Sequence, residues 1–195
     1  SDPLLIADMD KAVQAIEAAV DNEIKITVYG DYDCDGVTST VMLFTHLDAI
    51  GADVNWYIPT REEGYGLNEN AIRKLHEDGT GLIITVDNGV SAVNEAELIY
   101  ELGMKLVVTD HHQLPEILPK AEAIVNPHRQ DDNSPYKELA GCGVALKLIM
   151  ALERDVEGVL EQYADLAAIG TIGDVVALTG ENRIIVKRGL LEMQY

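Results

Sequence analysis

The sequence is poor in basic residues, with 14 Lys and Arg against 34 Asp and Glu and a formal net charge of −20. Surfaces that bind nucleic acids are usually basic, so the charge alone argues against a large nucleic-acid footprint. It is compatible with a cation-binding site, or with a surface whose charge only serves solubility.

Long apolar segments and paired cysteines are also lacking. No apolar run has the length of a membrane span, and the first residues lack the basic-then-apolar pattern of a secretory signal, so no membrane association is expected. The two cysteines, Cys34 and Cys142, have no metal-type spacing. A reduced, cytoplasmic setting is the simplest interpretation.

The length of 195 residues is enough for one domain with a substantial core, and the hydrophobic content of 47% is ordinary for a globular protein. The chain begins without Met and ends inside an apolar, helix-like stretch. We therefore expect residues 1–195 to be one domain cut from a longer protein, with a C-terminal end that begins a connecting helix.

Short β-rich runs alternate with helical patterns along most of the chain. This alternation predicts an α/β fold, a parallel β-sheet flanked by helices, followed by a helical C-terminal part. The predicted strands are 25–29, 53–58, 81–86, 105–109 and 122–125, and the predicted helices are 9–20, 37–50, 68–77 (with Asn68 as N-cap), 92–102, 139–152 and 156–169.

Acidic residues follow three of the predicted strands. These residues, with the two histidines beside the last, are Asp31, Asp33, Asp35, Asp87, Asp110, His111 and His112. Because ligands bind at the carboxyl ends of parallel strands, we expect these side chains to meet at one edge of the sheet. Asp174, in a glycine-punctuated turn between helical segments, is a further candidate for the same cluster.

Carboxylates and imidazoles together suit Mn²⁺ or Mg²⁺. Some five carboxylates favour two ions over one, and two ions about 3.5–4 Å apart are the usual arrangement for phosphoester hydrolysis. The alternative is structural: an aspartate after a strand is commonly a turn residue or a helix cap. A pair of histidines is likewise often structural.

Four short motifs carry a family resemblance: GDYDCDG at 30–36, VDNG at 86–89, DHH at 110–112 and GD at 173–174. In this order and spacing they resemble the motifs of the DHH phosphoesterases, and in particular those of the RecJ family of bacterial exonucleases. The segments YIPTREEGYGLN, VNPHR, LAGCGVALKL and IGTIGDVVALTGENR are also similar to RecJ proteins. The resemblance covers essentially the whole chain.

The resemblance implies the N-terminal DHH domain and 5′→3′ hydrolysis of single-stranded DNA to mononucleotides, with Mn²⁺ or Mg²⁺, in recombination and repair. It also implies, in the full protein, a DHH-associated domain and an oligonucleotide-binding fold, with a single-strand-binding protein and a helicase as partners. The basic surface that grips DNA would lie in those domains. We therefore expect this chain alone to bind DNA weakly.

The motifs also imply roles for individual residues. The expected metal ligands are Asp33, Asp35, Asp87, His111 and Asp174, with Asp31 either a sixth ligand or a residue that orients the loop. Asp31 is considered as a ligand because Tyr29 stands four residues before Asp33, where related phosphoesterases often supply a histidine ligand.

Three residues are expected to act on the substrate or on an imidazole. Asp110 would accept a proton from an imidazole, and His112 would contact the scissile phosphate or the leaving oxygen. Arg61, in a glycine-rich loop after a strand end, would hold a substrate phosphate, or else form an ion pair with a neighbouring acid such as Glu62. At the helix start around Gly141, the backbone amides would donate hydrogen bonds to a phosphate, or the glycines would allow close packing.

Other functions remain open on the sequence alone. An oligoribonuclease, nucleotide phosphatase or pyrophosphatase of the DHH type usually opens with a His-x-x-Pro-Asp-x-Asp pattern, whereas this chain has Gly-Asp-Tyr-Asp-x-Asp-Gly. A non-catalytic RecJ-like binding module would tend to have lost ligands. A domain that binds a metal only for stability, and catalyses no reaction, would not need two histidines beside acidic residues that follow three strands.

Overall fold

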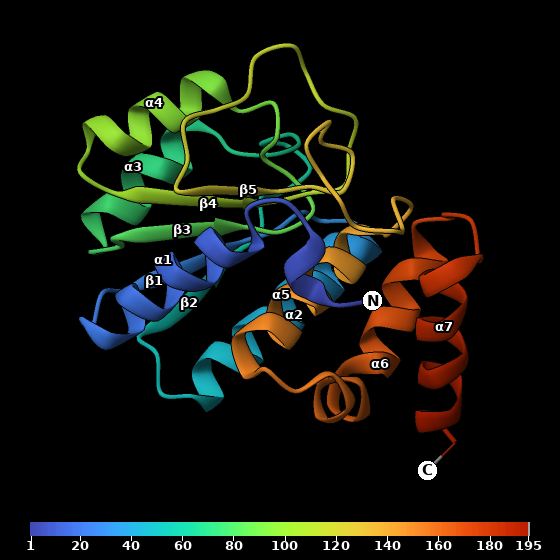
Figure 1. Cartoon of the computed structure of the whole chain (residues 1–195). Coiled ribbons are helices and arrows are strands. Elements are labelled where there is room, and N and C mark those ends of the chain that lie inside the picture. The colour runs from blue at the N-terminus through green and yellow to red at the C-terminus, as the bar shows by residue number, and fades with distance from the viewer. Residues whose placement is uncertain (195) are drawn as a thin grey trace.

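A five-stranded parallel sheet with strand order β2-β1-β3-β4-β5 runs through the computed structural model, which describes residues 1–194 (Figure 1). Every neighbouring pair of strands is parallel. The strands are β1 (Ile26–Tyr29), β2 (Val54–Tyr57), β3 (Leu82–Thr85), β4 (Lys105–Thr109) and β5 (Ala123–Val125). All five were predicted from the sequence, and the parallel α/β class is confirmed.

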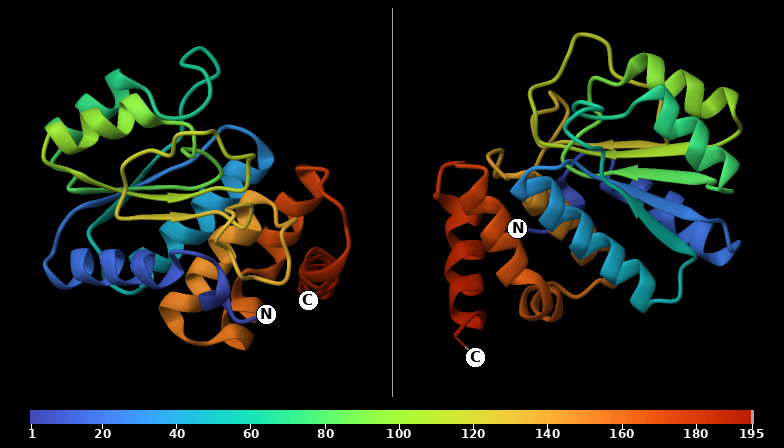
Figure 2. Two further views of the ribbon diagram at one scale, coloured as in Figure 1. Left: turned by 45° about the horizontal axis from the view of Figure 1, so that its top comes forward. Right: turned by 180° about the vertical axis from the view of Figure 1, so that it is seen from behind.

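Helices cover both faces of this sheet. In Figure 1, α3 and α4 lie above it and α1, α2 and α5 lie below it, while α6 packs against α2 and α5, and α7 packs against α6 (Figures 1 and 2). The helices are the 3₁₀ turn η1 (Pro3–Leu5), α1 (Met9–Asp21), α2 (Cys34–Ala49), α3 (Glu69–Glu77), α4 (Val93–Glu101), α5 (Gly141–Glu153), α6 (Val156–Gly173) and α7 (Gly180–Glu192). Within residues 1–194, no helix is both long enough and apolar enough to cross a membrane.

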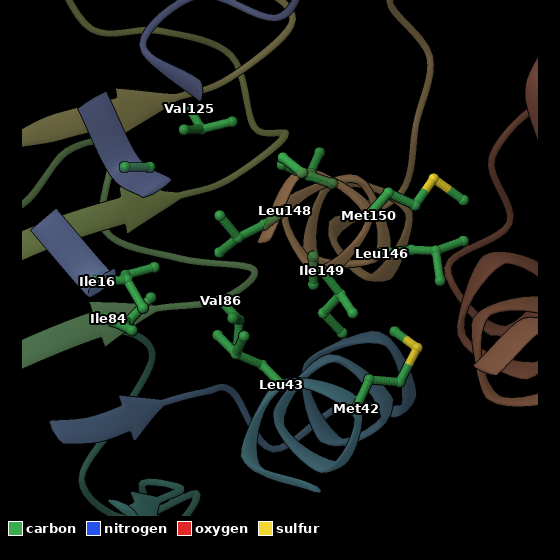
Figure 3. Close-up of a cluster of buried hydrophobic side chains, with 14 of the residues drawn as sticks. Ile16, Met42, Leu43, Ile84, Val86, Val125, Leu146, Leu148, Ile149 and Met150 are labelled. Carbon is green, nitrogen blue, oxygen red and sulfur yellow. The ribbon is translucent and has the colours of Figure 1, made fainter. Parts of the chain in front are cut away.

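The central strands are buried on both faces, which explains their continuous apolar sequences. Alternate residues of a strand point to opposite faces. Ile84 of β3 therefore joins the cluster beneath the sheet, with Leu43 of α2 and Leu148 of α5 (Figure 3), whereas Ile83 joins the cluster under α3 and α4. The two clusters fix the sheet from both sides and leave its carboxyl edge free for polar side chains.

Helix α2 begins earlier than the sequence predicted. The predicted helix was 37–50, but α2 begins at Cys34, because the carboxylate of Asp33 accepts a hydrogen bond of 2.7 Å from the amide of Gly36 and caps the helix. Asp35 consequently lies in the first turn of α2, almost directly after β1.

Helix α6 extends beyond the predicted end at residue 169 and reaches Gly173, with Asp174 as its C-cap. Asp174 lies, as predicted, in a turn between two helical segments, but the glycines before it, Gly170 and Gly173, belong to α6 and not to the turn. Gly170 and Gly173 lie inside the helix because they let it approach α2 closely: a Cβ on Gly173 would lie 2.8 Å from the Sγ of Cys34. This packing delivers Asp174 to the carboxyl edge of the sheet.

The core beneath the sheet gives a first prediction. Ile149 of α5 is fully buried in it (Figure 3), whereas Ile184 of α7 is 62% exposed. Ile149→Ala should lower the free energy of unfolding by about 2–5 kcal/mol, because it leaves a cavity, and Ile184→Ala should change it by less than about 1 kcal/mol. Urea unfolding followed by circular dichroism measures both. Equal losses in the two variants would contradict this placement of the core.

Candidate metal centre

The residues predicted as metal ligands meet at the carboxyl edge of the sheet. Their donor atoms form three overlapping groups, and within each group the atoms lie within 4.8 Å of one another. The groups are Asp31, Asp33 and Asp87; Asp35, His111 and Asp174; and Asp87, His111 and His112. The structure therefore brings all six candidate ligands together, with Asp87 and His111 shared between groups.

Asp87 and His111 lie at the centre of this arrangement. Asp87 follows β3, the middle strand of the sheet, and its Oδ1 lies 3.0 Å from Nε2 of His111. Nε2 also lies 3.6 Å from Asp35 Oδ2 and 3.7 Å from Asp174 Oδ2. Among residues 1–194, neither Asp87 Oδ1 nor His111 Nε2 has a hydrogen-bond partner, although both atoms are buried. Two buried, unpartnered donor atoms among carboxylates fit a divalent cation.

The start of α5 holds Asp35 in place. The amide of Gly141 donates to Asp35 Oδ2 at 2.7 Å and the amide of Cys142 donates to Oδ1 at 2.8 Å. The N-terminal end of a helix favours negative charge, so it stabilises this buried carboxylate. These amides thus orient a candidate metal ligand, a role that neither interpretation from the sequence had given them.

Burial and like charge raise the pKa of three carboxyl groups in the cluster. Burial is the largest cause for Asp31, Asp87 and Asp174, and the neighbouring charges of Asp33 and Asp35 raise all three pKa values further. The effect is greatest for Asp87, whose pKa lies far above its usual range. A cation is the partner that would allow these groups to ionise together.

Tyr29 takes no part in this cluster. Its side chain is fully buried in the core under α3 and α4, and its hydroxyl donates to the carbonyl of Gly66 at 3.1 Å. Asp31 instead is buried beside Asp33 and Asp87, close enough to share an ion with them. The carboxylate of Asp31 also accepts a hydrogen bond of 2.7 Å from the amide of Tyr32, so its position suits both a metal ligand and a residue that orients the loop.

Asp110 orients the second histidine. Its carboxylate accepts hydrogen bonds from the amides of Val90, His111 and His112, and Nδ1 of His112 lies 2.6 Å from its Oδ1. Burial alone would raise the pKa of Asp110, but its hydrogen bond with His112 makes the net shift downward, and the same bond raises the pKa of His112. With Nδ1 on Asp110, Nε2 of His112 is left for a substrate.

Tyr65 was not predicted as a site residue. Its hydroxyl donates to the carbonyl of Asp87 at 2.9 Å and lies 3.1 Å from Nδ1 of His112, against which its ring packs edge-on. The sequence feature that could have indicated Tyr65 is its position between Gly64 and Gly66, in a loop that follows a strand. A cavity of about 280 Å³, lined by this loop and by residues 89–92, opens beside His112.

Arg61 lies over the loop that carries the first three acids. Its guanidinium is 5.4 Å from the centre of the Tyr32 ring, a cation–π arrangement. Within residues 1–194 it forms no ion pair. Glu63 of the same loop instead accepts hydrogen bonds from the hydroxyl of Tyr57 and the amide of Thr60. The alternative of an ion pair to a neighbouring acid is therefore not what the structure shows.

The chain is similar to known proteins over nearly its whole length. The single-stranded-DNA-specific exonuclease RecJ of Bacillus subtilis is 47% identical over 190 residues, which are 97% of this chain and 24% of that protein. RecJ of Thermus thermophilus is 40% identical over 96% of this chain and 28% of its own length. The chain thus spans only about a quarter of these two relatives.

Solved structures give the same match. The crystal structure of an exonuclease RecJ bound to manganese superposes with a TM-score of 0.85 and 41% identity, over 95% of this chain and 48% of that one. The Thermus thermophilus RecJ in complex with Mn²⁺ gives a TM-score of 0.80 and 38% identity, over 95% of this chain and 27% of that one. The family description "DHH family, N-terminal domain" matches residues 25–171. With its strands, acidic strand ends and histidine pair all inside or beside that match, the chain belongs to the DHH family.

Proposed function

We propose that this chain is the DHH domain of a RecJ-type exonuclease, which hydrolyses phosphodiester bonds of single-stranded DNA from the 5′ end and releases mononucleotides in recombination and repair. The observation that carries the proposal is the pair of buried, unpartnered atoms, Asp87 Oδ1 and His111 Nε2, at the centre of a carboxylate cluster. The polarity and the substrate follow from the resemblance to RecJ proteins, whose name specifies single-stranded DNA.

The cofactor in this proposal is Mn²⁺ or Mg²⁺, as in the RecJ structures solved with each metal. Asp31, Asp33 and Asp87 would hold one ion, and Asp35, His111 and Asp174 a second. The two sets adjoin at Asp87 and His111, whose donor atoms lie 3.0 Å apart. When bound, such ions supply an activated water and stabilise the charge that develops on the phosphate.

His112 and Arg61 would act on the substrate directly. Asp110 holds the Nδ1 side of His112, so Nε2 is positioned to donate a hydrogen bond to a phosphate or leaving oxygen. Arg61, which makes no ion pair in the described part of the chain, retains its donors for a further phosphate along the strand.

The net charge of −20 limits what the chain can bind unaided. A DNA strand would be repelled from most of this surface, and we expect the metal centre and Arg61 to be its main points of attraction. Weak binding of DNA by the chain alone is therefore part of the proposal, with the stronger contacts made by other domains of a longer protein.

Manganese titration tests the metal centre. We expect about two ions per chain in isothermal titration calorimetry, and the loss of at least one in Asp87→Ala, because Asp87 belongs to two of the ligand groups. Asp48→Ala, on the exposed side of α2, is the matched control and should bind like the unaltered chain. Full binding in Asp87→Ala would refute the ligand assignment, and no binding by the unaltered chain would favour a non-catalytic module.

The raised pKa of Asp87 predicts how the metal-free fold depends on pH. Its pKa in the folded state lies above that of the unfolded chain, about 3.9, so its contribution falls as pH rises above that value. Asp87→Asn removes this charge and should stabilise the metal-free chain by about 1 kcal/mol or more at pH 8, and by much less at pH 4. Urea unfolding in EDTA at the two pH values measures the difference. A gain that does not grow with pH would contradict it.

Nuclease assays test the activity and the role of Arg61. Because the chain alone is expected to bind DNA weakly, the assay uses a longer protein that carries this domain together with the further DNA-binding domains. With manganese and a 5′-phosphorylated single strand, that protein should release mononucleotides, and Arg61→Ala should lower its kcat/KM about tenfold or more, because a charge-assisted contact to phosphate is lost. Arg73→Ala is the matched control, since Arg73 is bound to Glu69 on α3. Unchanged kinetics in Arg61→Ala would remove it from the site. No release of nucleotides by that manganese-loaded longer protein would overturn the exonuclease.

A further inference from the structure

The first residue of α5 lies directly against the side chain of Asp87. A Cβ built on Gly141 would lie 2.4 Å from Asp87 Oδ1, 2.6 Å from its Cβ and 2.7 Å from its Cγ. Real Cβ atoms do not come so close to other heavy atoms, so any residue other than glycine at 141 would have to displace Asp87 or α5.

The same helix start binds the other central carboxylate. The amides of Gly141 and Cys142 donate to the two oxygens of Asp35, so Gly141 contacts Asp87 through its Cα and Asp35 through its nitrogen. These two carboxylates belong to different ligand groups, and their charges repel. The end of α5 therefore sets the spacing between the two groups.

Neither partner has room to move away. Helix α5 is packed on both sides, with Ile149 in the core and Cys142 against α6, where its thiol lies 3.3 Å from the carbonyl of Ala167. Asp87 is buried, its backbone has a φ of +61°, and its carbonyl is held by the hydroxyl of Tyr65. A larger residue at position 141 would therefore displace the carboxylate of Asp87.

We propose that Gly141 is a positioning residue: by lacking a Cβ, it lets the start of α5 hold Asp35 and Asp87 at the spacing that two metal ions need. The claim that Gly141 leaves room for Asp87 depends only on the interatomic contacts. The claim that the resulting spacing suits two metal ions rests on the proposed function. A glycine two residues further on serves as a comparison. The three atoms nearest to a Cβ on Gly143 all belong to the Leu139 side chain, at 3.1, 3.3 and 3.7 Å, and none of them is a carboxylate atom.

A double-mutant cycle on the metal-free chain tests the claim that Gly141 leaves room for Asp87. Gly141→Ala is made in the unaltered chain, in Asp87→Asn and in Asp87→Gly, and the melting temperature Tm is measured in EDTA. We expect Gly141→Ala to lower Tm by about 5 °C or more in the first two backgrounds. In Asp87→Gly it should change Tm by less than about 2 °C, because the obstructing side chain is gone and glycine accepts the positive φ.

The Asp87→Asn background separates shape from charge, since asparagine has the size of aspartate without its charge. If Gly141→Ala does not fold, but folds once combined with Asp87→Gly, the steric contact is supported equally. The same loss of Tm in all three backgrounds, or no loss in any, would overturn the inference.

Manganese binding tests the positioning itself. At a temperature where each variant is folded, calorimetry should show at least tenfold weaker binding, or the loss of one ion, in Gly141→Ala and unchanged binding in Gly143→Ala. Unchanged affinity in Gly141→Ala would overturn the positioning role. Failure of the unaltered chain to bind manganese would count against the proposed function instead, while the unfolding cycle would still decide whether Gly141 fixes Asp87.

Discussion

The mutual repulsion of carboxylates buried at one edge of the sheet is the constraint on which the rest of this structure depends. Asp31, Asp35, Asp87 and Asp110 are almost fully buried, which is costly for charged groups without partners. Backbone amides offset part of this cost, most fully at Asp110 and at Asp35. Asp87 has no such donor for its Oδ1, and it is there that the structure most needs a cation.

The ends of the helices also stabilise some of these carboxylates more than others. The N-terminal ends of α2 and α5 point toward the cluster, and their partial positive charge favours Asp33 and Asp35. Helix α6 arrives with its C-terminal end, so Asp174 adds its carboxylate where the helix already carries partial negative charge. The carboxylate of Asp174 is therefore not compensated by the helix that carries it, and a bound cation would compensate it as well as Asp87.

The two hydrophobic clusters stabilise the sheet in spite of the repulsion between these carboxylates. Strands β1, β3 and β4 are apolar on both faces, so the sheet is fixed independently of what its carboxyl edge carries. Asp87 is held with a positive φ and its Oδ1 lacks a partner, and both features destabilise the metal-free chain. A bound cation would offset this destabilisation, so metal binding should increase the stability of the whole domain.

The sequence by itself determined the strands, the class of sheet and the acids that follow β1, β3 and β4, because these depend on local periodicity and on the rule that parallel strands end at one edge. Only the tertiary structure decided which partners those acids meet. The amide of Gly141 reaches Asp35 across 106 positions of the chain, and α6 brings Asp174 in because its glycines pack against α2. Tyr29 faces the core, and Arg61 stacks on Tyr32 instead of pairing with an acid. These contacts join segments that are distant in sequence or on opposite faces of the sheet, and local patterns carry no information about them.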